Sequence, residues 1–222
     1  MKKLNLILFA LIIISMPFLS CKKVLEAAFY GEPVPKETQI KIGENWWMQY
    51  NLSRTRFRNG DLIGEARTNE EWLKAGEEGK PAWCYYQNES DNDQKYGKLY
   101  NWYAVNDSRG LAPDGWHIPS DAEWTALENF LGGAQVAGTK MKSTSGWKRN
   151  DMNTNESGFT GMPGGRRSSD GSFVNEGEGG YWWSATENGS NAWFRMLSFS
   201  NTFVYRSSTG KNRGLSVRCI RD

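Results

Sequence analysis

The stretch "GGYWWSATENGSNAWFRMLSFSNTFVYRSS", residues 179–208, contains three strand-length segments separated by the turn-forming runs "NGSN" and "NT". Side chains alternate between the two faces of a strand, so Tyr181 and Trp183 share one face while Trp182 lies on the other. We therefore expect that the three rings are not all core. Trp183 and Trp193 are predicted to be core residues, and Trp182 is predicted to face a ligand.

Strand patterns also flank this stretch. "TQIKIGENWWMQYNL", residues 38–52, predicts a short strand, a turn at Gly43 and an aromatic second strand. Asn59-Gly60 is the strongest short hairpin-turn signal. "MPGGRRSSDGSF", residues 162–173, predicts another turn and returning strand, and "LSVRCIRD", residues 215–222, alternates apolar and polar side chains.

Two short helices are predicted before this β-rich half. The first begins after Thr68, with Glu71 completing a capping box, and ends at Gly76 or Gly79. The second begins after Ser120, with Glu123 in the same role, and ends at Gly132-Gly133. The fold class is therefore α+β, with two short helices against an antiparallel sheet.

Composition limits the size and the partners of the protein. The chain of 222 residues is long enough for one compact domain. Its 27 basic and 25 acidic side chains nearly balance, so charge gives no support for a nucleic-acid partner. Eleven Trp, nine Tyr and ten Phe alongside 24 Gly favour a loop-rich, antiparallel β-containing fold.

The N-terminal residues predict export and lipidation. Lys2 and Lys3 precede the apolar run "LNLILFALIIISMPFLS", and Cys21 follows it directly. "FLSC" resembles the lipobox of bacterial lipoproteins, although Phe18 stands where Leu is usual. We expect a signal peptide over residues 1–20, acylation (palmitate among the chains) at Cys21, a tether over 21–37 and one domain over 38–222. An ordinary cleaved signal or a single membrane anchor is the alternative.

Two cysteines remain after Cys21. An exported protein meets an oxidising environment, so a disulfide between Cys84 and Cys219 is the simple prediction. Two unrelated buried thiols are the alternative, because free Cys is often a core residue.

Several segments resemble a known family. "KYGKLYNWYAV", "GLAPDGWHIPSDAEW", "GFTGMPGGRRSSDGSF", "GYWWSATE" and "GLSVRCIRD" resemble the Fibrobacter succinogenes major paralogous domain, in its order and spacing, over about residues 38–222. That family occurs in many bacterial lipoproteins and secreted proteins. "GWHIPSDAEW" and the terminal strand also look like the sulfatase-modifying-factor group, which implies a C-type lectin-like fold.

This wider resemblance implies no particular chemistry. The formylglycine-generating enzyme of that fold uses a pair of nearby cysteines to bind copper, whereas Cys219 has no neighbouring Cys, so no catalytic residue is carried over. His117, the chain's single histidine, is predicted to be structural. The acidic loop at Asn88, Glu89, Asp91, Asn92 and Asp93 offers oxygen ligands but lacks EF-hand spacing. No metal or other cofactor is predicted there, and calcium is the alternative.

The sequence thus predicts a non-enzymatic recognition module of the bacterial outer membrane, anchored by lipid on the periplasmic or cell-surface side, that binds a glycan or an envelope protein. A structural or accessory subunit of an outer-membrane complex is the alternative. Aromatic and polar residues of the 182–213 region suit stacking and hydrogen bonding to such a ligand. The predicted ligand-binding residues are Trp182, Asn188, Asn191, Arg195, Asn201, Tyr205 and Arg206.

Overall fold

The computed structural model describes residues 38–222. The predicted signal peptide, the lipidation site Cys21 and the tether lie outside these residues. No helix in the described part is long and apolar enough to span a bilayer.

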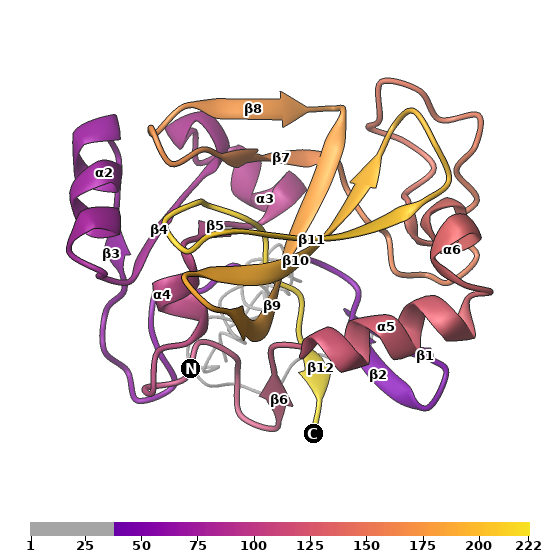
Figure 1. The fold of residues 1–222 in the computed structure, drawn as a ribbon, viewed down its shortest axis with the longest axis horizontal. Helices are drawn as coiled ribbons and strands as arrows, with labels where there is room; N and C mark the ends of the chain where they lie inside the picture. The colour runs from indigo at the N-terminus through magenta and orange to yellow at the C-terminus, as the bar shows by residue number, and fades with distance from the viewer. Residues whose placement is uncertain (1–37) are drawn as a thin grey trace, which may run out of the picture.

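Three sheets and five α-helices make up the described part of the chain, residues 38–222 (Figure 1). The first sheet has the order β1-β2-β12-β6 and consists of Gln39–Ile42, Asn45–Met48, Ile220–Arg221 and Trp116–His117. The second has the order β11-β10-β9-β7-β8 and consists of Val204–Gly210, Asn191–Ser198, Gly179–Asn188, Gly164–Arg167 and Phe173–Glu176. The third has the order β3-β4-β5 and consists of Gly64–Glu65, Ala82–Cys84 and Leu99–Tyr100.

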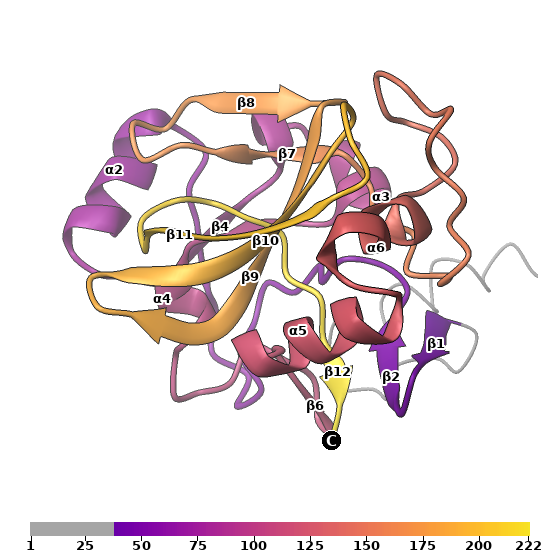
Figure 2. The ribbon, with the colours of Figure 1, turned by 45° about the vertical axis from the view of Figure 1, so that its right-hand side comes forward.

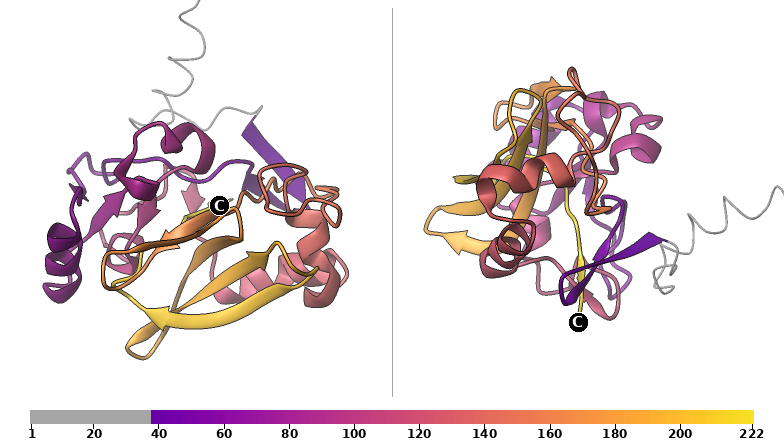
Figure 3. Two further views of the ribbon diagram at one scale, coloured as in Figure 1. Left: turned by 90° about the horizontal axis from the view of Figure 1, so that it is seen from above. Right: turned by 90° about the vertical axis from the view of Figure 1, so that its right-hand side faces the viewer.

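The helices are α2 (Asn69–Glu77), α3 (Asn92–Tyr96), α4 (Trp102–Val105), α5 (Asp121–Phe130) and α6 (Ala134–Met141). A 3-10 turn lies at Tyr86–Asn88. Helices α2 and α6 lie at opposite ends of the described domain (Figures 1 and 3). Strand β11, the edge strand of the second sheet, runs between these ends. The fold class α+β is confirmed.

Both predicted helix starts are confirmed. Thr68 accepts a hydrogen bond from the Glu71 backbone N–H, and the Glu71 carboxylate accepts one from the Thr68 N–H. Ser120 and Glu123 form the same reciprocal pair at the start of α5. The sequence prediction missed α3, α4 and α6, which are five, four and eight residues long. Short helices give too few turns for a readable apolar period.

Most of the predicted strands are also present, but the segment predicted as the last strand, residues 215–222, is a strand only at Ile220–Arg221. Strands β1 and β2 pair antiparallel on either side of the turn at Gly43, and β7 and β8 pair across the Asp170-Gly171 turn. Strands β9, β10 and β11 form a continuous antiparallel meander that twists strongly (Figure 2). The segment before β12 is mostly irregular, held by isolated bridges at Leu215 and Ser216.

Strand β9 is buried on both faces. Tyr181 and Trp183 pack in one hydrophobic cluster with Trp102 and Leu215, and Trp182 packs in another with Leu197 and neighbouring rings. The alternation was predicted correctly, but the inference that one ring must leave the core was wrong. Helices α5 and α6 pack on the Trp182 side of the sheet, whereas the segments around β4, β5 and α4 supply the cluster on the other side.

A buried arginine joins the last segment to the rest of the core. Arg218 is fully buried, and its guanidinium donates hydrogen bonds to the backbone oxygens of Met48, Gln49 and Phe159 and to the side chain of Asn51. Burial lowers the pKa of Arg218 to about 9. The alternating residues after Gly214 therefore have no solvent face: Leu215, Val217 and Cys219 are core on one side, and Ser216 and Arg218 are buried on the other.

Candidate functional site

The predicted ligand-binding residues divide between the two ends of β10. Asn188 and Asn191 flank the turn between β9 and β10, whereas Asn201 and Tyr205 lie at the turn between β10 and β11. The eight residues of β10 place these turns about 23 Å apart at the usual rise per residue. The predicted residues therefore do not form one surface.

Trp182 is not a surface residue. Its side chain is 0% exposed, its Nε1 donates a hydrogen bond to Asn51 Oδ1 over 2.8 Å, and its ring packs edge-on against Phe159 at 5.6 Å between centroids. The prediction that Trp182 contacts a ligand is wrong, because the helical layer covers the face of β9 that we took to be open.

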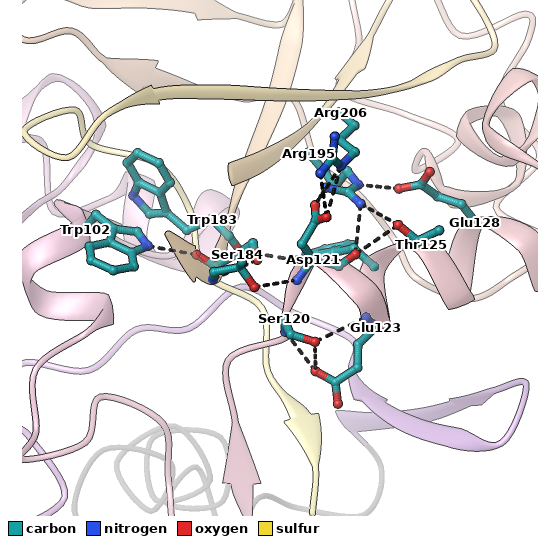
Figure 4. A network of polar contacts seen from close by, with 12 residues as sticks. Trp102, Ser120, Asp121, Glu123, Thr125, Glu128, Trp183, Ser184, Arg195 and Arg206 are labelled. Atoms are coloured by element: carbon teal, nitrogen blue, oxygen red, sulfur yellow. Dashed lines mark hydrogen bonds and ion pairs between the residues drawn. The ribbon is translucent and has the colours of Figure 1, made fainter. Parts of the chain in front are cut away.

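Arg195 is likewise buried, at 0% exposure. Its guanidinium binds the Glu128 carboxylate, donates to Asp121 Oδ1 over 2.7 Å and donates to Thr125 Oγ1 over 3.0 Å (Figure 4). All of these partners belong to α5. Arg195 therefore fixes α5 to the sheet, and the prediction that it contacts a ligand is wrong.

Arg206 is the exposed arginine of this network. Its guanidinium carbon lies 3.5 Å from the centroid of the Trp193 ring. Its Nε and Nη2 donate to both carboxylate oxygens of Asp121, over 3.0 and 2.8 Å (Figure 4). Burial raises the pKa of the Asp121 carboxyl, but hydrogen bonds from Arg206 and Arg195 outweigh it and bring the pKa below its usual value.

Two further side chains complete this end of the sheet. Asn188 Nδ2 donates a hydrogen bond to Ser208 Oγ over 3.0 Å, and Ser208 pairs with Trp193 across β10 and β11. We call Asp121, Asn188, Trp193, Arg206 and Ser208 the Trp193–Arg206 surface. Trp193 was predicted to be core, but it is only partly buried. Trp193 and Arg195 are two residues apart on β10 and so share a face of the sheet, and Arg195 pairs with Arg206. This spacing is the sequence signal that places Trp193 on the same face as Arg206.

The opposite end of β10 carries a smaller exposed group. Tyr205 is 40% exposed and Phe203 37%, and their ring centroids are 6.0 Å apart. Asn201 Nδ2 donates to the Tyr205 hydroxyl over 2.8 Å. These residues form an aromatic contact surface separate from the Trp193–Arg206 surface.

His117 lies between two carboxylates. Its Nε2 is 2.8 Å from Glu123 Oε1, and its Nδ1 is 2.6 Å from Asp222 Oδ1. Burial lowers the pKa of His117, but these hydrogen bonds outweigh it and raise the pKa above its usual value. The contacts tie β6 to the start of α5 and to residue 222, as expected of a structural histidine.

The predicted disulfide is not present. Cys84 and Cys219 are both free and buried, and they belong to different hydrophobic clusters. Burial raises the pKa of each thiol to about 12. Cys84 packs near Trp72 and Tyr86, whereas Cys219 packs with the cluster around Trp83, so each thiol serves as a small core side chain.

Two of the five candidate ligands in the acidic loop make contacts within the protein. The Asp93 carboxylate accepts hydrogen bonds from Lys98, over 2.8 Å, and from Ser53, while the Asn92 amide donates to the Tyr86 carbonyl. Across residues 38–222 there is no group of three His, Cys, Asp or Glu side chains that could hold a metal ion.

Comparison with known proteins gives one match. No curated protein and no solved structure matches the chain. The model of the Fibrobacter succinogenes major domain matches residues 40–221, which is nearly the whole described domain. The protein therefore belongs to the Fibrobacter succinogenes major domain family.

Proposed function

We propose that the protein is a non-catalytic recognition module of the bacterial envelope that binds a glycan or a surface protein through its Trp193–Arg206 surface. The observation that carries this proposal is the stacking of the Arg206 guanidinium on the Trp193 ring, with Asp121 fixing its orientation. Trp and Arg are, together with Tyr, the residue types most enriched among binding hot spots.

Rigidity supports the proposal. Asp121 is itself held by the buried Arg195, and α5 is fixed by its capping box, so the exposed guanidinium loses little freedom when a ligand binds. Arg206 Nε and Nη2 are engaged by Asp121, which leaves Nη1 to donate to a ligand oxygen. Asn188 and Ser208 add short polar groups beside the ring. An aromatic edge with adjacent amide and hydroxyl groups suits a sugar or a polar protein loop.

The buried thiols and the clamped histidine support a role without bond chemistry. A thiol with a pKa near 12 is protonated at neutral pH and is a poor nucleophile. Both ring nitrogens of His117 are engaged by carboxylates, which leaves neither free to act as a general base.

The proposal includes a C-type lectin-like arrangement and a lipid anchor. Two capped helices beside a twisted antiparallel sheet with long loops are consistent with that fold, and the Trp193–Arg206 surface lies on its C-terminal segment. Acylation at Cys21 would hold the domain at the outer membrane. Fold likeness alone does not choose the ligand.

Binding to a glycan array and pull-down from envelope extracts test the proposal. Trp193→Ala and Arg206→Ala should each weaken binding by about tenfold or more, since each removes half of the stacked pair. Tyr205→Ala is the matched control and should bind normally, because Tyr205 is an exposed aromatic whose row faces the opposite side of the sheet from Arg206.

Ligand binding that survives both substitutions would overturn the proposed surface. Capture of one stoichiometric envelope protein without any glycan signal, lost on Tyr205→Ala, would instead identify an accessory subunit that docks through Phe203 and Tyr205. The near-ultraviolet circular dichroism of the tryptophans confirms that each variant is folded.

A further inference from the structure

Two arginines meet on the face of the sheet opposite the Trp193–Arg206 surface. Arg166 lies in β7, and its guanidinium carbon is 5.2 Å from the centroid of the Tyr181 ring. The bridge between Arg167 and Gly214 brings Arg213, in the bend directly before Gly214, alongside β7. The charge of Arg166 acts on Arg213.

Neither guanidinium has a hydrogen-bond or ion-pair partner among residues 38–222, apart from the contact of Arg166 with Tyr181. The Nε of Arg166 is buried without any partner. By contrast, every guanidinium nitrogen of the adjacent Arg167 donates a hydrogen bond, to Ala66, Thr68, Asn69 or Gly171. A buried, unpaired N–H is costly, so the chain keeps at Arg166 a donor that its own fold does not satisfy.

The nearby carboxylates are engaged elsewhere. Asp170 is the acidic residue whose charge acts on Arg213. Its carboxylate accepts hydrogen bonds from the backbone N–H and the hydroxyl of Ser172. The negative charge of Glu178 acts on the hydroxyl of Tyr181. The Glu178 carboxylate accepts hydrogen bonds from Lys148 over 2.8 Å and from Asn175 over 3.4 Å. Burial, together with the charge of Arg166, lowers the pKa of Arg213 and outweighs the opposing effect of the Asp170 carboxylate.

We propose that Arg166 and Arg213 form a subsite for an oxyanion, the carboxylate or sulfate group of an acidic ligand. Tyr181 supports the plane of the Arg166 guanidinium, and two guanidiniums offer donors in the fork geometry that such groups accept. A bound anion would also relieve the repulsion between the two cations.

This subsite is independent of the proposed function. Tyr181, Met196 and Tyr205 are in register across β9, β10 and β11, and the next row is Trp182, Arg195 and Arg206. Adjacent rows face opposite sides of a sheet. The Arg166 subsite therefore lies on the Tyr181 side, away from Trp193 and Arg206.

Nuclear magnetic resonance of the arginine Nε–Hε groups tests the proposal in the full chain. The probes are sodium sulfate and sodium glucuronate, titrated at constant ionic strength with chloride as the balancing anion. Saturable shifts of the Arg166 and Arg213 signals are expected. Arg166→Gln should weaken the response of the Arg213 signal about tenfold, and Arg213→Gln should weaken that of the Arg166 signal by the same factor. Tighter binding of glucuronate than of sulfate would identify a sugar-borne carboxylate as the ligand group, and the reverse order a sulfate.

Arg149→Gln is the matched control, because Arg149 is an exposed arginine that already pairs with Asp151 over 2.7 Å. Its variant should respond like the wild type. Asp170→Asn should strengthen binding, since it removes the carboxylate that acts on Arg213. Shifts that rise linearly without saturation, or an unchanged affinity at the remaining arginine in either single variant, would overturn the subsite. Neither result bears on Trp193 and Arg206, so the two proposals fail separately.

Discussion

Burial determines what each arginine of the C-terminal region does. Arg195 and Arg218 are fully buried and donate to partners within the protein, whereas Arg206 is half exposed and stacks on Trp193. The partners of Arg195 include the buried Glu128 carboxylate. Each of these two charged groups therefore has the other as its partner in place of water. Sequence alone gives all three residues the same chemistry, and only their surroundings separate a buried structural arginine from one that is exposed at the proposed binding surface.

The Arg195–Glu128 pair makes a prediction at this scale. Arg195→Ala should lower the free energy of unfolding by roughly 3–5 kcal/mol, because it leaves the carboxylate of Glu128 buried without its guanidinium. Arg206→Ala removes an exposed ion pair and should cost no more than about 1 kcal/mol. Urea unfolding measures both, and equal losses would contradict the assignment of Arg195 as structural.

At the scale of elements, β9 is the centre of the domain because both of its faces are core. The strand accommodates Trp182 only because glycines precede the ring: a side chain at Gly180 would meet the Trp182 ring and would lie 2.6 Å from the Met162 carbonyl oxygen. The pair Gly179-Gly180 is thus a packing requirement rather than a turn. It lets β7 and β9 pair in parallel at Gly165 and Gly180.

Gly180→Ala should therefore destabilise the protein by about 1–3 kcal/mol or more, because the added methyl group overpacks the contact with Met162 and Trp182. Gly64→Ala is a suitable control, since its added carbon would make only an ordinary contact of 3.4 Å with the Pro81 carbonyl. That control should change the free energy of unfolding by no more than about 0.5 kcal/mol. Thermal unfolding distinguishes them, and a tolerated Gly180→Ala would disprove the close approach.

At the scale of the whole molecule, separate clusters of large rings hold the domain together without a cross-link. The cluster of Cys219 spans residues from β2 to the C-terminal segment, and the cluster of Cys84 joins α2, α3 and β4. These contacts join segments that are far apart in the sequence, which is what a disulfide between Cys84 and Cys219 would also have done. The two thiols are therefore ordinary core groups.

Alkylation under native conditions should leave Cys84 and Cys219 unmodified, because both are buried and burial raises their pKa to about 12. Unfolding in denaturant without reductant should expose both to modification. Peptide mass analysis locates the modified residues, so Cys21 does not enter the comparison. Two residues that stay unmodified in denaturant until a reductant is added would show a disulfide instead.

Local signals explain what could be predicted. The capping boxes at Thr68 and Ser120 need only neighbouring residues, and the turns at Gly43 and Asp170-Gly171 depend on backbone preferences of a few positions. The family segments predicted the extent of the resemblance closely, since the family model matches residues 40–221. Three short helices were missed because their formation depends on tertiary packing rather than on a sequence period.

The candidate site was predicted only in part for the same physical reason. The sequence by itself determined which side chains share a face of β9, β10 and β11, because alternation is a property of the extended backbone. Only the tertiary structure decided which face is covered, because burial depends on α5 packing over Trp182 and Arg195 from more than fifty residues away. That packing turned two predicted ligand contacts into core residues and left Trp193 and Arg206 at the surface.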